Sequence, residues 1–291
     1  MPLPLLCTLG HVATTGILAS RGVTRAHIRS AIADGSAVRL KLGTYACPHV
    51  SDPVRRAVEA GGALTCVSVL RDAGVWAGHS HQVHIQLAPG ARSPMTSNVV
   101  RHWEHPRFRM DTPWLAGRSQ ALWRALHCLD EENALAAMES AVHEHYLPAE
   151  EVQRIAQLAP RRLQDALGYR VGDSGSGNET IVRYRLQRVG YAVEAQAYVP
   201  GMGHEDLLVE GCVGLDVDGR QWHTGEDRFA NDRDRDLRVE GFGRRALRLR
   251  TSHIFETWPH TLAVIDRAVR DAKHEQLRRN GRVIISFDDP L

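Results

Sequence analysis

The stretch EDLLVEGCVGLDVDG, residues 205–219, contains the pattern that decides the fold of the C-terminal part of the chain. Five apolar residues alternate with other residues and are expected to share one buried face: Leu207, Val209, Val213, Leu215 and Val217. A two-residue turn would set Leu207 opposite Gly214 and split that face, because a one-residue slip turns every side chain over. The pattern therefore predicts two antiparallel strands with a three-residue turn over residues 210–212, where Gly211 can adopt a positive φ.

This register places Asp206 directly across from Asp216. Opposed residues on one face have Cβ atoms about 4.5–5.5 Å apart, where two like charges are unfavourable. A hard divalent cation with oxygen ligands, Mg²⁺ or Mn²⁺, would relieve the repulsion, so Asp206 and Asp216 are the candidate metal ligands. Asp218 projects from the same face. The alternative is that these aspartates lie in solvent near strand ends.

The surrounding sequence predicts an αβββαβα order. The expected elements are a helix at 178–190, strands at 193–199, 205–210 and 213–218, a helix at 227–240, a strand at 244–250 and a helix at about 259–278. This order indicates an α/β domain with a central sheet.

Two further residues near the aspartates have both a structural and a functional interpretation. Ser176 and Glu179 fit an S-x-x-E capping box. Glu179 also shares a helical face with Val182, Leu186 and Val189, which we expect to pack on the sheet, so its carboxylate could reach the aspartates. His223 follows the third strand and could transfer a proton, or could simply pack beside Trp222.

The run from Glu179 through Gln196 and Asp206 to DVDG at 216–219, His223 and DRDRD at 232–236 resembles the DUF559 domain. The likeness covers about residues 174–270. DUF559 is related to very-short-patch-repair endonucleases within the PD-(D/E)xK superfamily.

This resemblance implies a restriction-endonuclease-like αβββαβ core and a Mg²⁺-dependent endonuclease. Asp206 and Asp216 would be its metal-binding acids, Glu179 would support the metal or its water, and Asp218 or His223 would assist proton transfer. Asp218 occupies the place of the superfamily's motif lysine, which puts a lysine-assisted mechanism in doubt.

Arginines are concentrated in the same region. Residues 219–250 contain nine arginines and six acids. Four of the arginines are candidate phosphate contacts: Arg233, Arg235, Arg245 and Arg248. A solvated, salt-bridged helix face is the alternative, because aspartates interleave with them.

The N-terminal segment predicts a helix followed by a hairpin. Thr24 is a candidate N-cap, Val23 and Ile28 form a hydrophobic staple, and Gly35 ends the helix. Short strands at 38–40 and 44–46 flank Gly43, and a weaker helix falls within 11–20. With GVT at 22–24 and GTYA at 43–46, the segment resembles the winged helix-turn-helix of AbiEi-type antitoxins, although many small three-element domains share this pattern.

The middle of the chain predicts a strand at 83–87, helical segments within 119–145 and a helix from Pro148 to about Leu158. His79, His81 and His84 are expected to be solvated rather than metal-bound, because no further ligand is indicated nearby. The glycine-rich GDSGSG at 172–177 marks a boundary. The expected domains are a winged helix at 1–50, an AbiEi-like middle α/β region at 51–172 and the nuclease domain at 173–291.

The chain has 291 residues, 43% hydrophobic residues and a net charge of +2, a composition typical of globular rather than disordered proteins. Its five cysteines contain no C-x-x-C pair, so neither a disulfide framework nor a zinc knuckle is indicated, and a reducing cytoplasm is expected. The sequence contains no stretch of 18 uncharged apolar residues, so no membrane span is predicted.

Taken together, these features predict a metal-dependent nuclease acting on double-stranded DNA, with a nucleic-acid-binding N-terminal module. A toxin or antitoxin protein partner, or a homodimer, fits the family resemblance. The alternative function is a non-catalytic, antitoxin-type DNA-binding regulator with a degenerate nuclease fold.

Overall fold

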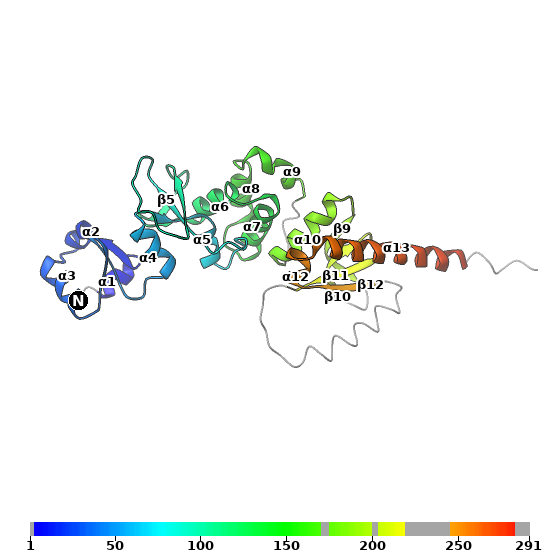
Figure 1. Ribbon diagram of the computed structural model, residues 1–291, viewed down its shortest axis with the longest axis horizontal. Coiled ribbons are helices and arrows are strands. Elements are labelled where there is room, and N and C mark those ends of the chain that lie inside the picture. The colour runs from blue at the N-terminus through cyan, green and yellow to red at the C-terminus, as the bar shows by residue number, and fades with distance from the viewer. Residues whose placement is uncertain (1–2, 170–174, 200–202, 219–244, 283–291) are drawn as a thin grey trace, which may run out of the picture. The chain divides into compact units, whose positions relative to one another are not determined.

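The computed structural model describes residues 3–169, 175–199, 203–218 and 245–282 (Figure 1). The chain is a mixed α/β protein, as expected, and it divides into two compact units. The first unit comprises residues 1–130 and 144–161, and the second comprises residues 131–143 and 162–291. The predicted boundaries at 50 and 172 stay a prediction. Among the described residues, no helix is both long and apolar enough to span a membrane.

The first unit begins with three short helices and a small sheet of order β1-β3-β2. These elements are α1 (Leu3–Thr8), β1 (Val12–Thr14), α2 (Thr15–Ser20), α3 (Arg25–Ala33), β2 (Val38–Lys41) and β3 (Thr44–Ala46). Thr24 caps α3 by accepting a hydrogen bond from the His27 N–H at 3.2 Å, and Gly43 adopts φ +73° in the hairpin turn. The expected helix and hairpin are confirmed, whereas the segment 11–20 is a strand followed by a short helix.

A second sheet of order β6-β5-β4-β8-β7 forms the rest of the first unit. Its elements are α4 (Asp52–Glu59), β4 (Ala63–Leu64), α5 (Cys66–Asp72), β5 (Val83–Leu87), β6 (Val99–Trp103), β7 (Met110–Thr112), β8 (Leu115–Ala116), α6 (Arg118–Leu126) and α8 (Ala149–Ala156). The strand at 83–87 is confirmed, but all five of its residues are buried. His84 is therefore a core residue, and the expectation that it is solvated is wrong; His79 and His81 are exposed.

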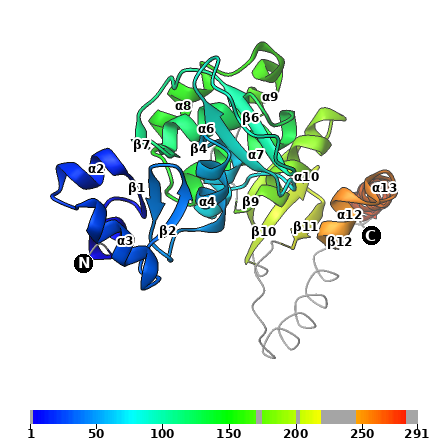
Figure 2. The same cartoon turned by 60° about the vertical axis from the view of Figure 1, so that its left-hand side comes forward.

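The second unit contains a four-stranded sheet of order β12-β11-β10-β9, in which β12 is parallel to β11 and the other pairs are antiparallel. Helices α10, α12 and α13 lie beside it (Figure 2). The described elements are α7 (Glu131–His143), α9 (Gln164–Leu167), α10 (Gly177–Arg188), β9 (Val193–Val199), β10 (Gly203–Val209), β11 (Val213–Val217), β12 (Arg245–Leu249), α12 (Thr251–Phe255) and α13 (Trp258–Arg282). A short 3₁₀ turn, Arg161–Leu163, precedes α9.

The β10–β11 hairpin has the predicted register. Leu207 pairs with Leu215 and Val209 with Val213, and the turn between them uses positive φ at Glu210 and Gly211. The five alternating apolar residues of this hairpin are all buried. The helix expected at 227–240 lies outside the described residues.

The helical segments expected within 119–145 are confirmed as two helices, α6 and α7, which fall in different units. The acidic first turn of α7, with Glu131 and Glu132, is typical of a new helix start. Val189 is the C-cap of α10 and is 57% exposed, so it does not pack on the sheet as expected.

Candidate functional site

The candidate site lies where β10 and β11 approach the first turn of α10. Beyond the last paired residues, Leu207 and Leu215, the chain continues to Asp206 and Asp216. The Asp206 carboxylate accepts a hydrogen bond from the backbone N–H of Val217 at 2.8 Å. Asp206 is thereby tied across the strand pair to the residue after Asp216.

Glu179 faces this strand pair from α10. Its backbone N–H donates to the Ser176 hydroxyl at 3.2 Å, which completes the N-cap. Its carboxylate is buried and accepts hydrogen bonds from the Gly175 N–H and the Gln196 amide, both at 3.0 Å. Both interpretations of the sequence therefore hold in part, since the backbone of Glu179 serves the cap while its side chain turns toward β9 and β10.

Burial and the neighbouring Asp206 carboxylate together raise the pKa of Glu179 to about 7. Burial is the larger cause because removing a carboxylate from water disfavours its charged form, and a like charge adds to the effect. Glu179 and Asp206 therefore share one electrostatic environment. A carboxyl group that titrates near neutrality can hold or release a proton under physiological conditions.

Gln196 stands opposite Asp206 in an unusual backbone conformation. Pairing of β9 with β10 includes Ala197 with Glu205 and Ala195 with Leu207, which leaves Gln196 facing Asp206. Gln196 has φ +50°, a left-handed conformation that costs a non-glycine residue energy and is concentrated at functional sites. This local irregularity accompanies the hydrogen bond from the Gln196 side chain to Glu179.

Arg248 brings a positive charge to the acidic cluster, which consists of Glu179, Asp206, Asp216 and Asp218. It pairs with Asp216 in the β11–β12 register, and its guanidinium lies 3.7 Å from the Asp216 carboxylate and 3.9 Å from that of Asp218. Asn178, which is buried, donates a hydrogen bond to the Asp218 carbonyl at 3.0 Å. The acidic end of β11 is thus anchored by α10 and neutralised in part by β12.

The chemistry of these donors fits a hard divalent cation. Carboxylate oxygens are the ligands that Mg²⁺ and Mn²⁺ prefer. The pKa of Glu179 is raised mainly by burial and in smaller part by repulsion from Asp206, and a cation would relieve that repulsion. Asp206 and Asp216 would hold the ion. Within the described ranges, however, no three carboxylates of the site have oxygens within 4.8 Å of one another. Two groups of cysteine and histidine side chains in the first unit do come that close: Cys66, His84, His102 and Cys128, and Cys7, Cys47 and His49.

The other residues expected at the site have different outcomes. His223, Arg233 and Arg235 lie outside the described residues. Arg245 forms an ion pair with Asp271 at 3.1 Å. Arg248 lies 3.7 Å from Asp216, and its contact with a phosphate stays a prediction.

Sequence reasoning missed two neighbours of the site, Asn178 and His204. Asn178 occupies the first turn of α10, and nothing in its sequence context indicates a contact with residue 218. The His204 Nδ1 atom lies 3.1 Å from the carbonyl oxygen of Gln196. His204 precedes the acidic residues Glu205 and Asp206, and that proximity was the available signal.

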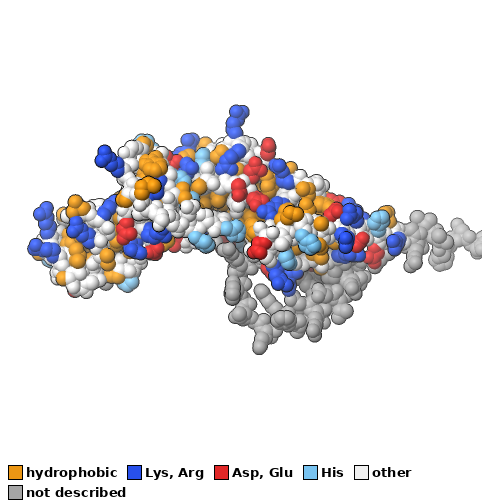
Figure 3. Space-filling view, viewed as in Figure 1, with side chains coloured by type: hydrophobic (Ala, Val, Ile, Leu, Met, Phe, Trp, Pro, Cys, Tyr) orange, Lys and Arg blue, Asp and Glu red, His pale blue; other side chains and the backbone are white. Residues whose placement is uncertain are grey.

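The N-terminal module exposes basic side chains. Residues 1–50 contain five lysines and arginines but one acid. Arg25 and Arg29 lie one turn apart on the exposed face of α3, and Figure 3 shows basic side chains at this end of the first unit. The module therefore presents a positive surface although the whole chain is almost neutral.

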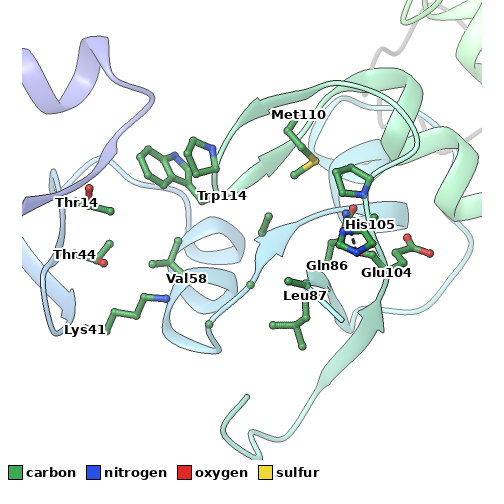
Figure 4. Close-up of a pocket in the computed structure, with 16 residues that line it drawn as sticks. Thr14, Lys41, Thr44, Val58, Gln86, Leu87, Glu104, His105, Met110 and Trp114 are labelled. Carbon is green, nitrogen blue, oxygen red and sulfur yellow. Dashed lines mark hydrogen bonds between the residues drawn. The ribbon is translucent and has the colours of Figure 1, made fainter. Parts of the chain in front are cut away.

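The first unit also contains a cavity of about 330 Å³. Lys41, Val58 and Trp114 line one part of it, and Gln86 and Glu104 line another (Figure 4). Glu104 is held by Arg124 at 2.8 Å. The cavity thus combines apolar walls with one ammonium and one paired carboxylate.

A scan against models of protein families finds no match to this chain, and a search of curated proteins finds none either.

Proposed function

We propose that the protein is a metal-dependent nuclease that hydrolyses phosphodiester bonds of DNA. The observation that carries this proposal is the shared environment of Glu179 and Asp206 at the end of the β10–β11 hairpin. The described order α10-β9-β10-β11-β12 supports a PD-(D/E)xK-type core of the kind the DUF559 resemblance implies, with β12 parallel to β11.

Asp206 and Asp216 would hold a Mg²⁺ ion, which when bound polarises the scissile phosphate and lowers the pKa of the attacking water. Glu179, whose pKa is near 7, would hold or accept a proton during the reaction. Asp218 and His223 are the other candidates for proton transfer, with Asp218 held through its carbonyl by Asn178.

Arg248 supplies the positive charge that the motif lysine supplies elsewhere in the superfamily. Asp218 occupies the lysine position, but the Arg248 guanidinium lies within 4 Å of both Asp216 and Asp218. A fixed cation beside the reacting phosphate stabilises the charge that develops there in the transition state. The absence of the lysine therefore does not leave the proposed site without a cationic side chain.

The N-terminal module would bring the protein to duplex DNA. Three helices and a β1-β3-β2 sheet support a winged helix-turn-helix, in which α3 would be the recognition helix. The exposed Arg25 and Arg29 are placed to contact phosphates.

A second candidate function is a non-catalytic DNA-binding regulator. It is favoured by the basic N-terminal surface together with Asp218 at the lysine position. In this case the second unit would serve as an interaction platform for a toxin-type protein or for a second copy of the chain, and the acidic cluster would perform no chemistry.

Cleavage assays separate these functions. Purified protein is incubated with plasmid DNA, single-stranded DNA and RNA in Mg²⁺, Mn²⁺ or EDTA. We expect cleavage of duplex DNA with either metal, none in EDTA, and a loss of at least 10²-fold in Asp206→Asn. Asp266→Asn is the matched control, because an asparagine can still accept the hydrogen bond from Tyr191. Metal-independent cutting, or no cutting of any substrate by the wild type, would rule against the nuclease.

A further inference from the structure

Four cysteine and histidine side chains converge in the core of the first unit. Cys66, His84, His102 and Cys128 each offer one ligand atom, and all four atoms lie within 4.8 Å of one another. They come from the start of α5, from β5, from β6 and from the segment after α6. We propose that these four residues form a zinc site of the Cys₂His₂ type.

Two of the distances between ligand atoms match a tetrahedral ion. The His84 Nδ1 and His102 Nε2 atoms are 3.2 Å apart, and the Cys128 Sγ atom is 3.7 Å from His84 Nδ1. Zn–N distances of 2.0–2.1 Å and a Zn–S distance of 2.3 Å place two nitrogens about 3.3 Å apart, and a nitrogen and a sulfur about 3.6 Å apart, around a tetrahedral centre. The ligand atoms of His84, His102 and Cys128 are therefore already spaced for coordination in these two pairs.

The donor set selects the ion. Two thiolates and two imidazoles suit Zn²⁺ and other borderline or soft metals, whereas Mg²⁺ prefers oxygen ligands. Two thiolates also cancel the double charge of the ion, so the centre is neutral. This matters because Cys66, His84 and His102 are buried, and an uncompensated charge in that environment would be costly.

Cys66 has a strained backbone conformation. Cys66 has φ +57° at the first position of α5. A non-glycine residue in the left-handed region costs on the order of 1–3 kcal/mol and persists where the surroundings over-determine it. Next to it, the Ser68 hydroxyl accepts the His84 N–H at 2.8 Å, which ties α5 to β5 beside the cluster.

Zinc binding is coupled to the release of protons. The thiolate, not the thiol, is the metal ligand, so each cysteine of the cluster releases its proton to solvent as its Zn–S bond forms. Each histidine binds through a neutral ring nitrogen.

Four protein ligands leave no open position, which is typical of a structural rather than a catalytic zinc site. The ion would cross-link α5, β5, β6 and the end of α6. Cys128 is the exposed member, so chelators and oxidants have access from that side. A second group in the same unit, Cys7, Cys47 and His49, has three ligand atoms equally close together and provides an internal control.

Metal content of the full chain tests the site. The protein is purified under reducing conditions without chelator, and its metals are measured by mass spectrometry. We expect about one zinc per chain in the wild type, and a drop of at least tenfold in Cys66→Ser and in His102→Asn. The double variant Cys7→Ser/His49→Gln is the control and should keep that zinc. Loss of zinc in the control with retention in the other two variants would overturn the assignment.

A measurement on the wild type guards against variants that fail to fold. The metal-free protein is loaded with Co²⁺ and then titrated with Zn²⁺. We expect intense visible bands of tetrahedral Co²⁺ and a thiolate charge-transfer band, both abolished by stoichiometric Zn²⁺, together with a rise in melting temperature on zinc binding. No metal uptake, or a Cys66–Cys128 disulfide formed in place of uptake under reducing conditions, would overturn the proposal.

Discussion

The Arg183 guanidinium of α10 lies 2.7 Å from both carboxylate oxygens of Glu139 in α7, and both side chains are fully buried. The Thr180 hydroxyl donates a further hydrogen bond of 2.7 Å to the same carboxylate. This buried pair joins α7 to α10 and explains why residues 131–143 belong to the second unit although they precede it in sequence. The helix that presents Glu179 is thus fixed by a charge pair in its own middle.

Removing one partner of this pair should make the second unit easier to unfold. Removing one partner leaves an uncompensated buried charge, which typically costs about 3–5 kcal/mol. We expect Arg183→Met to lower the free energy of unfolding by about that amount in urea denaturation. Arg188→Ala is the control, because its pair with Glu131 is long, at 3.8 Å, and half exposed, and it should cost under about 1 kcal/mol. A double variant Glu139→Leu/Arg183→Met that is no more stable than Arg183→Met would argue against the pair.

The pKa of Glu179 predicts a pH-dependent stability. Its value of about 7 in the folded protein lies above the ordinary 4.5, so the stability it contributes is complete below pH 4.5 and is lost as the pH rises through 7. Glu179→Gln stays neutral and can still accept the hydrogen bonds from Gly175 and Gln196. In EDTA, the variant should match the wild type at pH 4.5 and exceed it by roughly 3 kcal/mol at pH 8.5. Parallel stability curves for the two proteins across this range would contradict the raised pKa.

Arg248 is expected to act on the reaction rather than on folding. Its side chain is half exposed and lies 3.7 Å from the Asp216 carboxylate and 3.9 Å from that of Asp218, so Arg248→Ala should change stability by less than about 1 kcal/mol. Loss of a cation beside the reacting phosphate should lower single-turnover cleavage by about 10²-fold. Arg248→Lys should recover part of the rate, and Arg270→Ala on α13 is the control. An Arg248→Ala variant that cuts at the wild-type rate would remove this residue from the mechanism.

The basic face of α3 should contribute to DNA affinity without affecting chemistry. Removing one side chain that neutralises a phosphate lowers the slope of log K against log salt by about 0.9. Arg25→Ala/Arg29→Ala should therefore bind duplex DNA more weakly and with a slope smaller by up to about 2. Arg55→Ala is the matched control, since Arg55 is paired with Asp52 and Glu59. Unchanged duplex binding by the double variant would point instead to a protein partner for this face.

The register of the β10–β11 hairpin could be predicted because apolar residues alternate strictly with other residues in a half-buried strand pair. The helix at 25–33 could be predicted because its capping residues are close to it in the sequence. The proximity of Glu179 to the acidic strands followed from one helical face. Contacts between segments that are distant in the sequence could not be predicted, because no local pattern indicates them. The four residues of the Cys/His cluster are separated by 17, 17 and 25 other residues, so tertiary packing alone brings them together. The position of Gln196 depends on a left-handed backbone conformation, which a glutamine in the sequence does not predict.

Metal binding at Asp206 and Asp216 is the most direct test of the proposed nuclease site. Calorimetric titration of the zinc-loaded protein with Mn²⁺ should show one additional site, and Asp206→Asn and Asp216→Asn should each weaken it by at least tenfold, whereas Asp266→Asn should not. The measurement needs no nucleic acid, so the Mn²⁺ affinities report on the two carboxylates alone. Equal Mn²⁺ binding by the wild type and by both site variants would show that the acidic end of the hairpin is not a metal site.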